Sequence, residues 1–392
     1  MRVNHFLTVL FLFSFAACSK DNTDDNGGDD RGNQYPTMEV TIHQSLFMNL
    51  HDVRERNSDT RMMDSLIHYV DHVPKGESFH MSIYLFDYRP LVSAVVRAIN
   101  RGVVANLLID NSHADESKVI NQSTFTNLRS AVNSTPSRLI AVENNITATS
   151  INHQKYVIFS KIALPHGEAK NVVFSTSHNF QISDTRKVQD AIVMSNKGLY
   201  EAFLRNWNDI ASLADSDMKN FAYKVENVGD SIKAFFFPRL SNGVWDGGDP
   251  ITEVLNKLTN FSSKDTIFVG MAGFTNPRAS IAEKLVSLQK SGVQVELVTR
   301  AESGSAVLSN LGQIAANGGY VKLLTTSQVN IHSKFMLIKG FYEGKYQTII
   351  LCGSENYSGN ALYNNNEQML MLMNSSLFDN YWNHFKEIKQ TL

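Results

Sequence analysis

Residues 81–110 read MSIYLFDYRPLVSAVVRAINRGVVANLLID, and residues 267–298 repeat the pattern as IFVGMAGFTNPRASIAEKLVSLQKSGVQVELV. Each stretch begins with an apolar strand and continues through a proline-containing turn into a helix with apolar residues at helical spacing. Each helix stops at a glycine, Gly102 or Gly292, which suits the left-handed backbone of a helix C-cap. A strand rich in Val and Leu follows, so the sequence predicts two βαβ units.

The similarity continues downstream of both units. Three further segments match in the same order, namely HQKYVIFS (153–160) with HSKFMLIK (332–339), VVFSTSHNF (172–180) with ILCGSENY (350–357), and QDAIVM (189–194) with NEQMLM (366–371). We therefore expect an α/β protein of two similar halves, 38–216 and 217–392, packed pseudo-symmetrically. Because the strands are almost continuously apolar, each half is expected to hold a mixed, mainly parallel sheet flanked by helices. The first half is expected to carry an insertion at 111–146, with an amphipathic helix near 125–132.

The composition narrows the class of protein. The chain has 392 residues, 43% of them hydrophobic, which allows a sizeable core and excludes a fibrous or wholly disordered protein. Its 36 Lys and Arg residues nearly balance 38 Asp and Glu residues, and the acidic excess lies in the N-terminal segment. A neutral body gives no general electrostatic reason to bind nucleic acid, although a local basic groove stays open. Two cysteines cannot support a disulfide-dense scaffold.

The N-terminus has the features of a targeting signal. An apolar run, Phe6–Ala17, is too short to span a bilayer as a helix, and it ends at Cys18. The letters FAAC resemble the lipobox of a bacterial lipoprotein, although Phe15 departs from the usual Leu; a plain secretory signal is the alternative. We expect a signal peptide at 1–17, a lipid on Cys18 and an acidic flexible tether at 18–37. The protein is then a cell-envelope lipoprotein, most simply of the outer membrane, facing the periplasm or the surface.

The duplicated segments carry chemically useful side chains. Residues i and i+2 of a strand point to the same side, so His153 projects with Lys155, and His332 with Lys334. Two similar halves whose strands end at one seam place these pairs face to face. The sequence thus predicts a single site with two imidazoles and two ammonium groups.

An amide and a carboxylate follow each pair. Asn179 precedes Asp190 by 11 residues, and Asn356 precedes Glu367 by the same number, so the two acids are expected in equivalent places. Hydroxyl groups stand in the same turns, and strand ends commonly line ligand crevices in α/β sheets. Further candidates for substrate contact are therefore Ser177, Ser354, His178, Asp110 and Arg300. For His178, a purely structural role in a polar turn is the alternative.

This set of groups suits displacement at a phosphodiester. Lysine and asparagine side chains donate hydrogen bonds to the phosphoryl oxygens, where charge accumulates. One imidazole attacks phosphorus while the other protonates the leaving alkoxide, and carboxylates hold the ring tautomers. Two lysines supply the positive charge that a metal otherwise brings, so we expect no metal and no cofactor.

The doubled H-x-K followed by G-S-x-N resembles the phospholipase D superfamily, over nearly the whole chain from residue 40 onward. The resemblance implies a phosphohistidine intermediate, with His153 as nucleophile and His332 as general acid and base; the reverse assignment stays open. It also implies that Asp190 and Glu367 orient the two imidazoles.

The sequence departs from the family motif at three positions. The motif has an Asp five residues after each Lys, where this chain has Ser160 and Lys339. Thr176 replaces the motif Gly in the first half. We interpret the missing aspartates as changed support for the site rather than lost activity.

Three functions are compatible with these residues. The first is hydrolysis or transfer of a phospholipid head group, favoured because a lipid tether concentrates the enzyme at membranes. The second is a nuclease, which would use a groove lined by Lys155, Lys334, Lys339 and Arg300. The third is a surface binding protein with a decayed site. None of these requires a protein partner.

Overall fold

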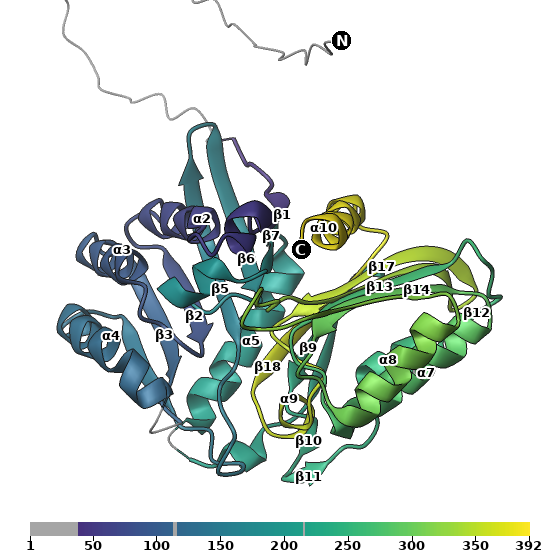
Figure 1. Cartoon of the computed structure of the whole chain (residues 1–392). Helices are drawn as coiled ribbons and strands as arrows, with labels where there is room; N and C mark the ends of the chain where they lie inside the picture. Colours follow the sequence, from purple (N-terminus) through teal and green to yellow (C-terminus); the bar gives the residue numbers. More distant parts are fainter. Residues whose placement is uncertain (1–37, 113–115, 215) are drawn as a thin grey trace, which may run out of the picture. The chain divides into compact units, whose positions relative to one another are not determined.

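Two β-sheets, one from each half of the repeat, form the framework of the protein (Figure 1). The computed structural model describes residues 38–112, 116–214 and 216–392. The predicted signal peptide, Cys18 and the tether therefore lie outside the described residues. Residues 38–392 form one compact unit, so the predicted boundary between halves at 216 and 217 stays a prediction.

The first sheet has seven strands. Their bounds are β1 His43–Phe47, β2 Ser78–Ile83, β3 Val104–Asp110, β4 Arg138–Val142, β5 Lys155–Leu164, β6 Gly167–Thr176 and β7 Asp190–Ser195. They lie in the order β1-β7-β6-β5-β2-β3-β4.

The second sheet repeats this order with one added edge strand. Its strands are β8 Lys224–Val228, β9 Ile232–Phe237, β12 Leu258–Thr259, β13 Thr266–Met271, β14 Gln294–Arg300, β15 Tyr320–Leu324, β16 Lys334–Tyr342, β17 Lys345–Gly353 and β18 Glu367–Met373. The order is β15-β14-β13-β16-β17-β18-β9-β8, and β12 pairs with β16. A separate hairpin joins β10 Leu240–Ser241 to β11 Val244–Trp245. The edge strand β1 of the first sheet therefore corresponds to β9 of the second.

The predicted α/β fold class with two similar halves is confirmed. Both sheets are mixed, but parallel pairing is confined to β2-β3-β4 and to β13-β14-β15, and the other pairings are antiparallel. The parallel part is thus smaller than the apolar strands indicated. Antiparallel strands are equally apolar here because helices cover both faces of the sheets.

The helices have the following bounds: α1 Leu50–Arg54, α2 Arg61–Asp71, α3 Arg89–Asn100, α4 Ser117–Val132, α5 Lys197–Leu213, α6 Pro250–Asn256, α7 Ala279–Lys290, α8 Ser305–Ala316, α9 Gly359–Tyr363 and α10 Phe378–Thr391. Short 3-10 helices among the described residues are η1 Ile182–Arg186, η2 Met218–Asn220 and η3 Asn276–Arg278. Among the described residues, no helix combines the length and hydropathy needed to cross a bilayer.

The two predicted βαβ units are β2-α3-β3 and β13-α7-β14. Apolar residues of α3 such as Leu91, Val95 and Ala98 are fully buried, as their spacing predicts. After the helices, Gly102 has φ of 90° and Gly292 has φ of 99°, which other residues rarely adopt. Both predicted C-cap glycines are therefore confirmed.

The predicted insertion at 111–146 requires a correction. Helix α4 and strand β4 do lie in this segment, but α8 and β15 occupy the corresponding place in the second half. The helix is therefore part of the repeat, and only the connections around it are longer. Sequence comparison missed this because α4 and α8 share no obvious residue pattern.

One helix from each half lies between the two sheets. Helix α5 packs on β2, β5 and β6 and also reaches β8 and β9, whereas α10 packs on β13, β16 and β17 and also reaches β1 (Figure 1). Phe203 of α5 meets Phe236 edge-on at 5.2 Å, and Tyr381 of α10 meets Phe47 at 4.9 Å. These contacts belong to one hydrophobic core shared by both halves. Burial of such apolar surface fixes the halves together and so fixes the geometry of any site at their seam.

Candidate active site

Each predicted histidine is anchored to the opposite half of the molecule. The backbone N–H of His153 donates to the carbonyl of Asn366 at 2.9 Å, and that of His332 donates to the carbonyl of Val188 at 2.9 Å. These bonds are part of short parallel bridges that join the segments just before β5 and β16 to those just before β18 and β7. The shared seam predicted from the repeat therefore exists, and it brings both H-x-K segments to it.

His153 lies against a carboxylate of the second half. Its Nδ1 is 2.8 Å from both carboxyl oxygens of Glu367, which is fully buried on β18. Burial lowers the pKa of His153, and the nearby ammonium groups of Lys155 and Lys334 lower it further, which favours the neutral ring. In the tautomer that fits this contact, Nδ1–H donates to Glu367 and Nε2 keeps a free lone pair. Glu367 therefore orients an imidazole, as expected, but this imidazole belongs to His153 of the opposite half.

His332 has a different partner from the one predicted. Its Nδ1 lies 3.0 Å from Oε1 of Gln189 and 3.1 Å from the carbonyl oxygen of Ser177. Asp190 was expected here, but its carboxylate accepts a hydrogen bond from the hydroxyl group of Tyr381 at 3.0 Å and lies 3.2 Å from the hydroxyl oxygen of Ser177. The expectation that Asp190 orients an imidazole is therefore corrected: Gln189 occupies that place.

A difference of one residue explains the correction. The N–H of Ser177 donates to the carbonyl of Asp190, whereas that of Ser354 donates to the carbonyl of Gln368. Asp190 therefore corresponds to Gln368, and the turn before it is one residue shorter than the turn of the second half. Because side chains alternate along a strand, a shift of one residue moves the acid to the opposite face. The equal spacing of 11 residues was thus coincidental.

The two motif lysines lie near each other, and neither forms a close ion pair with a carboxylate of the described residues. Nζ of Lys155 donates to the carbonyl of His153 at 2.7 Å, and Nζ of Lys334 donates to that of His332 at 2.5 Å. Burial lowers the pKa of Lys155 to about 7. Burial also lowers the pKa of Lys334 well below its usual range, and repulsion from Lys155 adds to this effect. Two crowded cations of this kind favour the binding of an anion between them.

The two asparagines lie in the turns just after β6 and β17. The side-chain oxygen of Asn356 accepts from the N–H of Gly273 at 3.1 Å, which leaves its amide nitrogen as the group available to donate. The side-chain oxygen of Asn179 is buried and has no hydrogen-bond partner among the described residues. The N–H of Asn179 donates to Asp184 at 3.0 Å, so the turn itself is fixed.

Three predicted substrate contacts support the site from within the protein. The hydroxyl of Ser177 donates to Gln189 at 2.9 Å, and that of Ser354 donates to Glu367 at 2.5 Å. His178 is fully buried, and its Nδ1 donates to the neighbouring backbone carbonyl of Asn179. The two serines thus hold the partners of the two imidazoles, whereas His178 contacts the backbone of the turn, which fits the structural alternative considered for it.

Asp110 and Arg300 occupy equivalent positions at the ends of β3 and β14. The carboxylate of Asp110 accepts from the N–H of Asn152 at 3.4 Å, and Nε of Arg300 donates to the carbonyl of Ile331 at 3.0 Å. Each side chain thus secures the residue just before a site histidine. Asp110 is fully buried and does not face solvent, whereas Arg300 is half-buried and its charge acts on Lys334.

The residues that replace the motif aspartates lie away from the imidazoles. The hydroxyl of Ser160 donates to Glu77 at 2.8 Å, and Nζ of Lys339 stands 5.5 Å from the ring of Trp382. Each lies five residues along its strand from the site lysine, a separation of roughly 16 Å. Lys339 therefore does not join Lys155, Lys334 and Arg300 in a basic groove, which corrects that expectation.

Three site residues were not found from the sequence. The prediction named Asp190 instead of the adjacent Gln189. Oδ2 of Asp184 is 4.0 Å from Nδ1 of His332, and the repeat in the sequence offers no matching residue that could have indicated it. The ring of Tyr84 packs 5.3 Å from that of His153 and 5.6 Å from Nζ of Lys155. Tyr84 follows the carboxyl end of β2. Because ligand sites in α/β sheets lie at such strand ends, this position could have indicated Tyr84 as a site residue.

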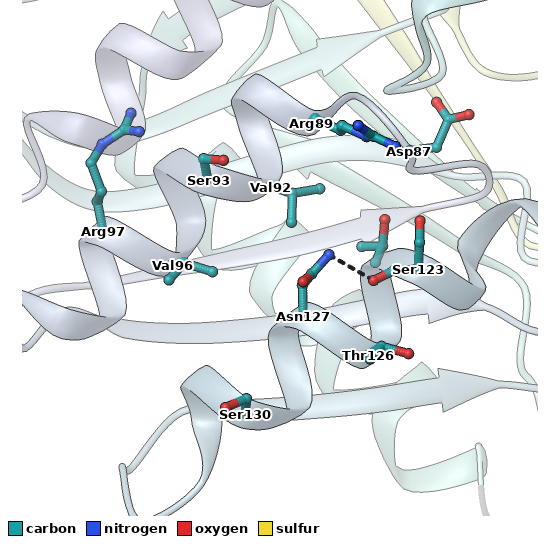
Figure 2. A pocket seen from close by; sticks show the side chains of 11 residues that line it. Asp87, Arg89, Val92, Ser93, Val96, Arg97, Ser123, Thr126, Asn127 and Ser130 are labelled. Carbon is teal, nitrogen blue, oxygen red and sulfur yellow. Dashed lines mark hydrogen bonds between the residues drawn. The ribbon is translucent and has the colours of Figure 1, made fainter.

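The molecule has a separate groove between α3 and α4, with a volume of about 810 Å³ (Figure 2). Its lining includes Arg97, Val96 and Asn127, and Asn127 donates to the carbonyl of Ser123 at 2.9 Å. No side chain of the predicted site lines it. Within the described ranges, no three His, Cys, Asp or Glu side chains come together as a metal site.

Comparison with solved structures identifies the same fold in a phosphatidylserine synthase and a polyphosphate kinase. Phosphatidylserine synthase from Haemophilus influenzae superposes with a TM-score of 0.61 and 12% identity over 89% of this chain and 86% of its own. Polyphosphate kinase from Porphyromonas gingivalis superposes with a TM-score of 0.54 and 12% identity over 88% of this chain, which spans only half of the kinase. Nuc from Salmonella typhimurium, a phospholipase D family member, is 19% identical and covers 44% of this chain with 95% of its own, at a TM-score of 0.33.

Sequence comparison gives the family. No protein with a curated description matches the chain. The family model described as "Cardiolipin synthase, PLD-like domain" matches twice, over residues 73–209 and 258–389. The two matches cover most of the chain and include both H-x-K segments. The chain therefore belongs to the phospholipase D-like family and carries two copies of its domain.

Proposed function

We propose that the protein hydrolyses or transfers phosphodiesters, with a phospholipid head group as the substrate class, through a phosphohistidine on His153. The observation that carries the proposal is the pair of imidazoles, each fixed through Nδ1 by the opposite half, beside two crowded lysines. Family membership supports phosphodiesterase or phosphotransferase chemistry in general. The family description and the predicted lipid tether both favour a phospholipid.

The reaction starts with attack by a neutral imidazole. The Nε2 lone pair of His153 forms a bond to phosphorus, the bond from phosphorus to the leaving oxygen breaks, and that oxygen takes a proton from Nε2 of His332. Lys155 and Lys334 neutralise the phosphoryl oxygens. In the second step, water or an alcohol attacks phosphorus and gives its proton to His332, and the nitrogen–phosphorus bond returns its electrons to His153.

The partners of the two rings support this division of roles. A phosphorylated imidazole is cationic, so the carboxylate of Glu367 stabilises it on His153. Among the described residues, the hydrogen-bond partners of Nδ1 of His332 are carbonyl-type oxygens, and the nearest carboxylate, Asp184, lies 4.0 Å away, so a permanent cation is stabilised less strongly there. The assignment of His153 as nucleophile therefore no longer depends on family resemblance alone.

The other two functions are less well supported. A nuclease uses the same chemistry, but Lys339 lies apart from the other three cations, so the basic groove proposed for nucleic acid is incomplete. A decayed binding protein has no need of the close contact between His153 and Glu367, which is intact. We also propose a location in the cell envelope, on the basis of Cys18 and the apolar run before it.

The proposal is tested by head-group release from vesicles of mixed phospholipids. Purified protein should release a head group, and His153→Ala should reduce the rate by several orders of magnitude. The folded state of the variant is checked by its circular dichroism. Cleavage of DNA without any release of lipid head groups would overturn the choice of substrate. Activity of His153→Ala equal to that of the wild type would overturn the mechanism.

A further inference from the structure

In the part of the chain that the structure describes, the hydrogen bonds of His332 run through a neutral amide to a carboxylate, whereas His153 contacts its carboxylate directly. Gln189 is fully buried, and its Oε1 lies 3.0 Å from Nδ1 of His332. On its other side, Nε2 of Gln189 donates to Oδ2 of Asp184 at 3.1 Å. Because a carboxylate only accepts, it fixes which end of the amide faces the imidazole. The oxygen of Gln189 therefore faces His332, and the ring must donate from Nδ1.

The carboxylate at the far end of this chain is itself held firmly. Asp184 is fully buried on η1, where Oδ2 also accepts from the N–H of Asn179 at 3.0 Å and Oδ1 pairs with Lys187. Burial alone raises the pKa of this carboxyl, but the charge of Lys187 and the hydrogen bonds outweigh burial, so its pKa is lowered. Asp184 is therefore a fixed anion that lies 4.0 Å from Nδ1 of His332, beyond direct hydrogen bonding.

The two histidines thus receive their carboxylates in different ways. Glu367 touches His153 directly, whereas Asp184 reaches His332 through the neutral amide of Gln189. Direct contact with an anion stabilises a lasting positive charge on a ring more than contact with an amide does. A general acid must instead release its proton in the transition state and regain it afterwards.

The geometry points to Gln189 and Asp184 as positioning residues that make His332 the proton donor to the leaving group and reserve the nucleophilic role for His153. This inference rests on the proposed function. Gln189 holds Nδ1–H in place throughout, so Nε2 is the only ring atom that exchanges a proton. During attack on phosphorus that proton passes to the leaving oxygen, and during hydrolysis a proton from water replaces it.

The charges around His332 are consistent with this role. Burial disfavours the imidazolium form most, and the charges of Lys334 on β16, Lys187 just after η1, Arg300 on β14 and Lys155 on β5 add to this effect, whereas Asp184 opposes it. An anionic phosphodiester between the two lysines neutralises part of this repulsion. His332 is therefore protonated most readily when substrate is bound, which is when a proton donor is needed.

The test uses two soluble phosphodiesters that share the transferred phosphoryl part and differ only in the leaving group. A 4-nitrophenolate leaving group needs little protonation, whereas an alkoxide needs a general acid. Gln189→Ala should therefore lose about 10²- to 10³-fold in kcat/KM on the alkyl ester and only a few-fold on the 4-nitrophenyl ester. Asp184→Asn should also lose more activity on the alkyl ester than on the 4-nitrophenyl ester, with a smaller loss overall. If Gln189→Ala does not fold, the Asp184→Asn variant tests the inference.

Thr185→Val is the matched control. Thr185 is buried next to Asp184 on η1 and donates to the carbonyl of Ile182 at 2.6 Å, without any contact to Gln189 or His332 among the described hydrogen bonds. Its ratio of the two activities should equal that of the wild type. Equal losses on both esters in the Gln189 and Asp184 variants would overturn the inference while leaving the proposed function intact. A wild-type protein inactive on both esters would instead overturn the proposed function.

Discussion

Glu367, on β18 of the second half, lies 2.8 Å from Nδ1 of His153, which precedes β5 of the first half. His332 of the second half in turn lies 3.0 Å from Gln189 of the first. Each imidazole thus takes its orientation from the other half. The duplication therefore produces one site that requires both halves, not two independent sites.

Glu367→Gln should reduce kcat by about 10²- to 10⁴-fold, because an amide permits the wrong tautomer of His153 and removes the charge that stabilises its phosphorylated form. The fold should be retained, since Gln has nearly the same shape. Single-turnover kinetics with quantification of the phosphorylated protein measure the effect. A variant that forms the intermediate at the wild-type rate would contradict the role of Glu367.

The pH dependence should reflect Lys155. Its pKa is lowered to about 7 by burial, so the free enzyme loses this positive charge as pH rises through 7. The value of kcat/KM should therefore decline above about pH 7, and loss of the proton from the general acid His332, whose pKa is lowered by burial and by neighbouring cations, adds to this decline. The pKa of His153 lies below its usual range, so the acidic limb should fall below about pH 6.5, the ordinary value for His.

The phosphate of bound substrate favours the ammonium form of Lys155, so the decline in kcat should occur at higher pH than the decline in kcat/KM. Initial rates from pH 5 to 9, at subsaturating and saturating substrate, separate the two parameters. If kcat and kcat/KM declined at the same alkaline pH, this result would argue against a buried lysine at the phosphoryl oxygens.

Tyr381→Phe should destabilise the protein by about 1–3 kcal/mol, because the buried carboxylate of Asp190 loses the hydroxyl that bonds it at 3.0 Å. The substitution should lower the free energy of unfolding more than it affects catalysis, since Asp190 does not contact an imidazole. Urea unfolding measures the change. The exposed Tyr346→Phe is the control and should shift stability by less than about 0.5 kcal/mol.

Asp110→Ala should lower activity at least tenfold, because the segment that presents His153 loses the carboxylate that holds the N–H of Asn152. Asp110→Asn keeps an acceptor at the same place and should retain most of the activity. Comparison of kcat for the two variants checks the prediction. Equal losses would mean that the charge of Asp110, rather than the hydrogen bond, matters.

Cys18→Ser should abolish incorporation of radiolabelled palmitate into the full-length protein expressed in a bacterial host, because the thiol is the predicted site of lipid attachment. The variant should also leave the membrane fraction. Cys352→Ser is the matched control: this thiol is buried on β17, and its loss should leave labelling unchanged. Undiminished labelling of Cys18→Ser would overturn the lipoprotein prediction.

The sequence by itself determined the fold class, the duplication and the identities of His153, Lys155, His332 and Lys334. These features are encoded locally, because strand alternation, helix periodicity and cap glycines follow from neighbouring residues. Repetition made them recognisable.

Only the tertiary structure decided which side chain meets which ring. The difference of one residue in turn length puts Gln189 rather than Asp190 beside His332, and it is invisible in residue spacing because an acid stands 11 positions after each asparagine. Likewise, each imidazole contacts a side chain of the other half, and this depends on how the two sheets pack on their shared core. Contacts between residues far apart in the chain are set by packing and register, which no local pattern encodes.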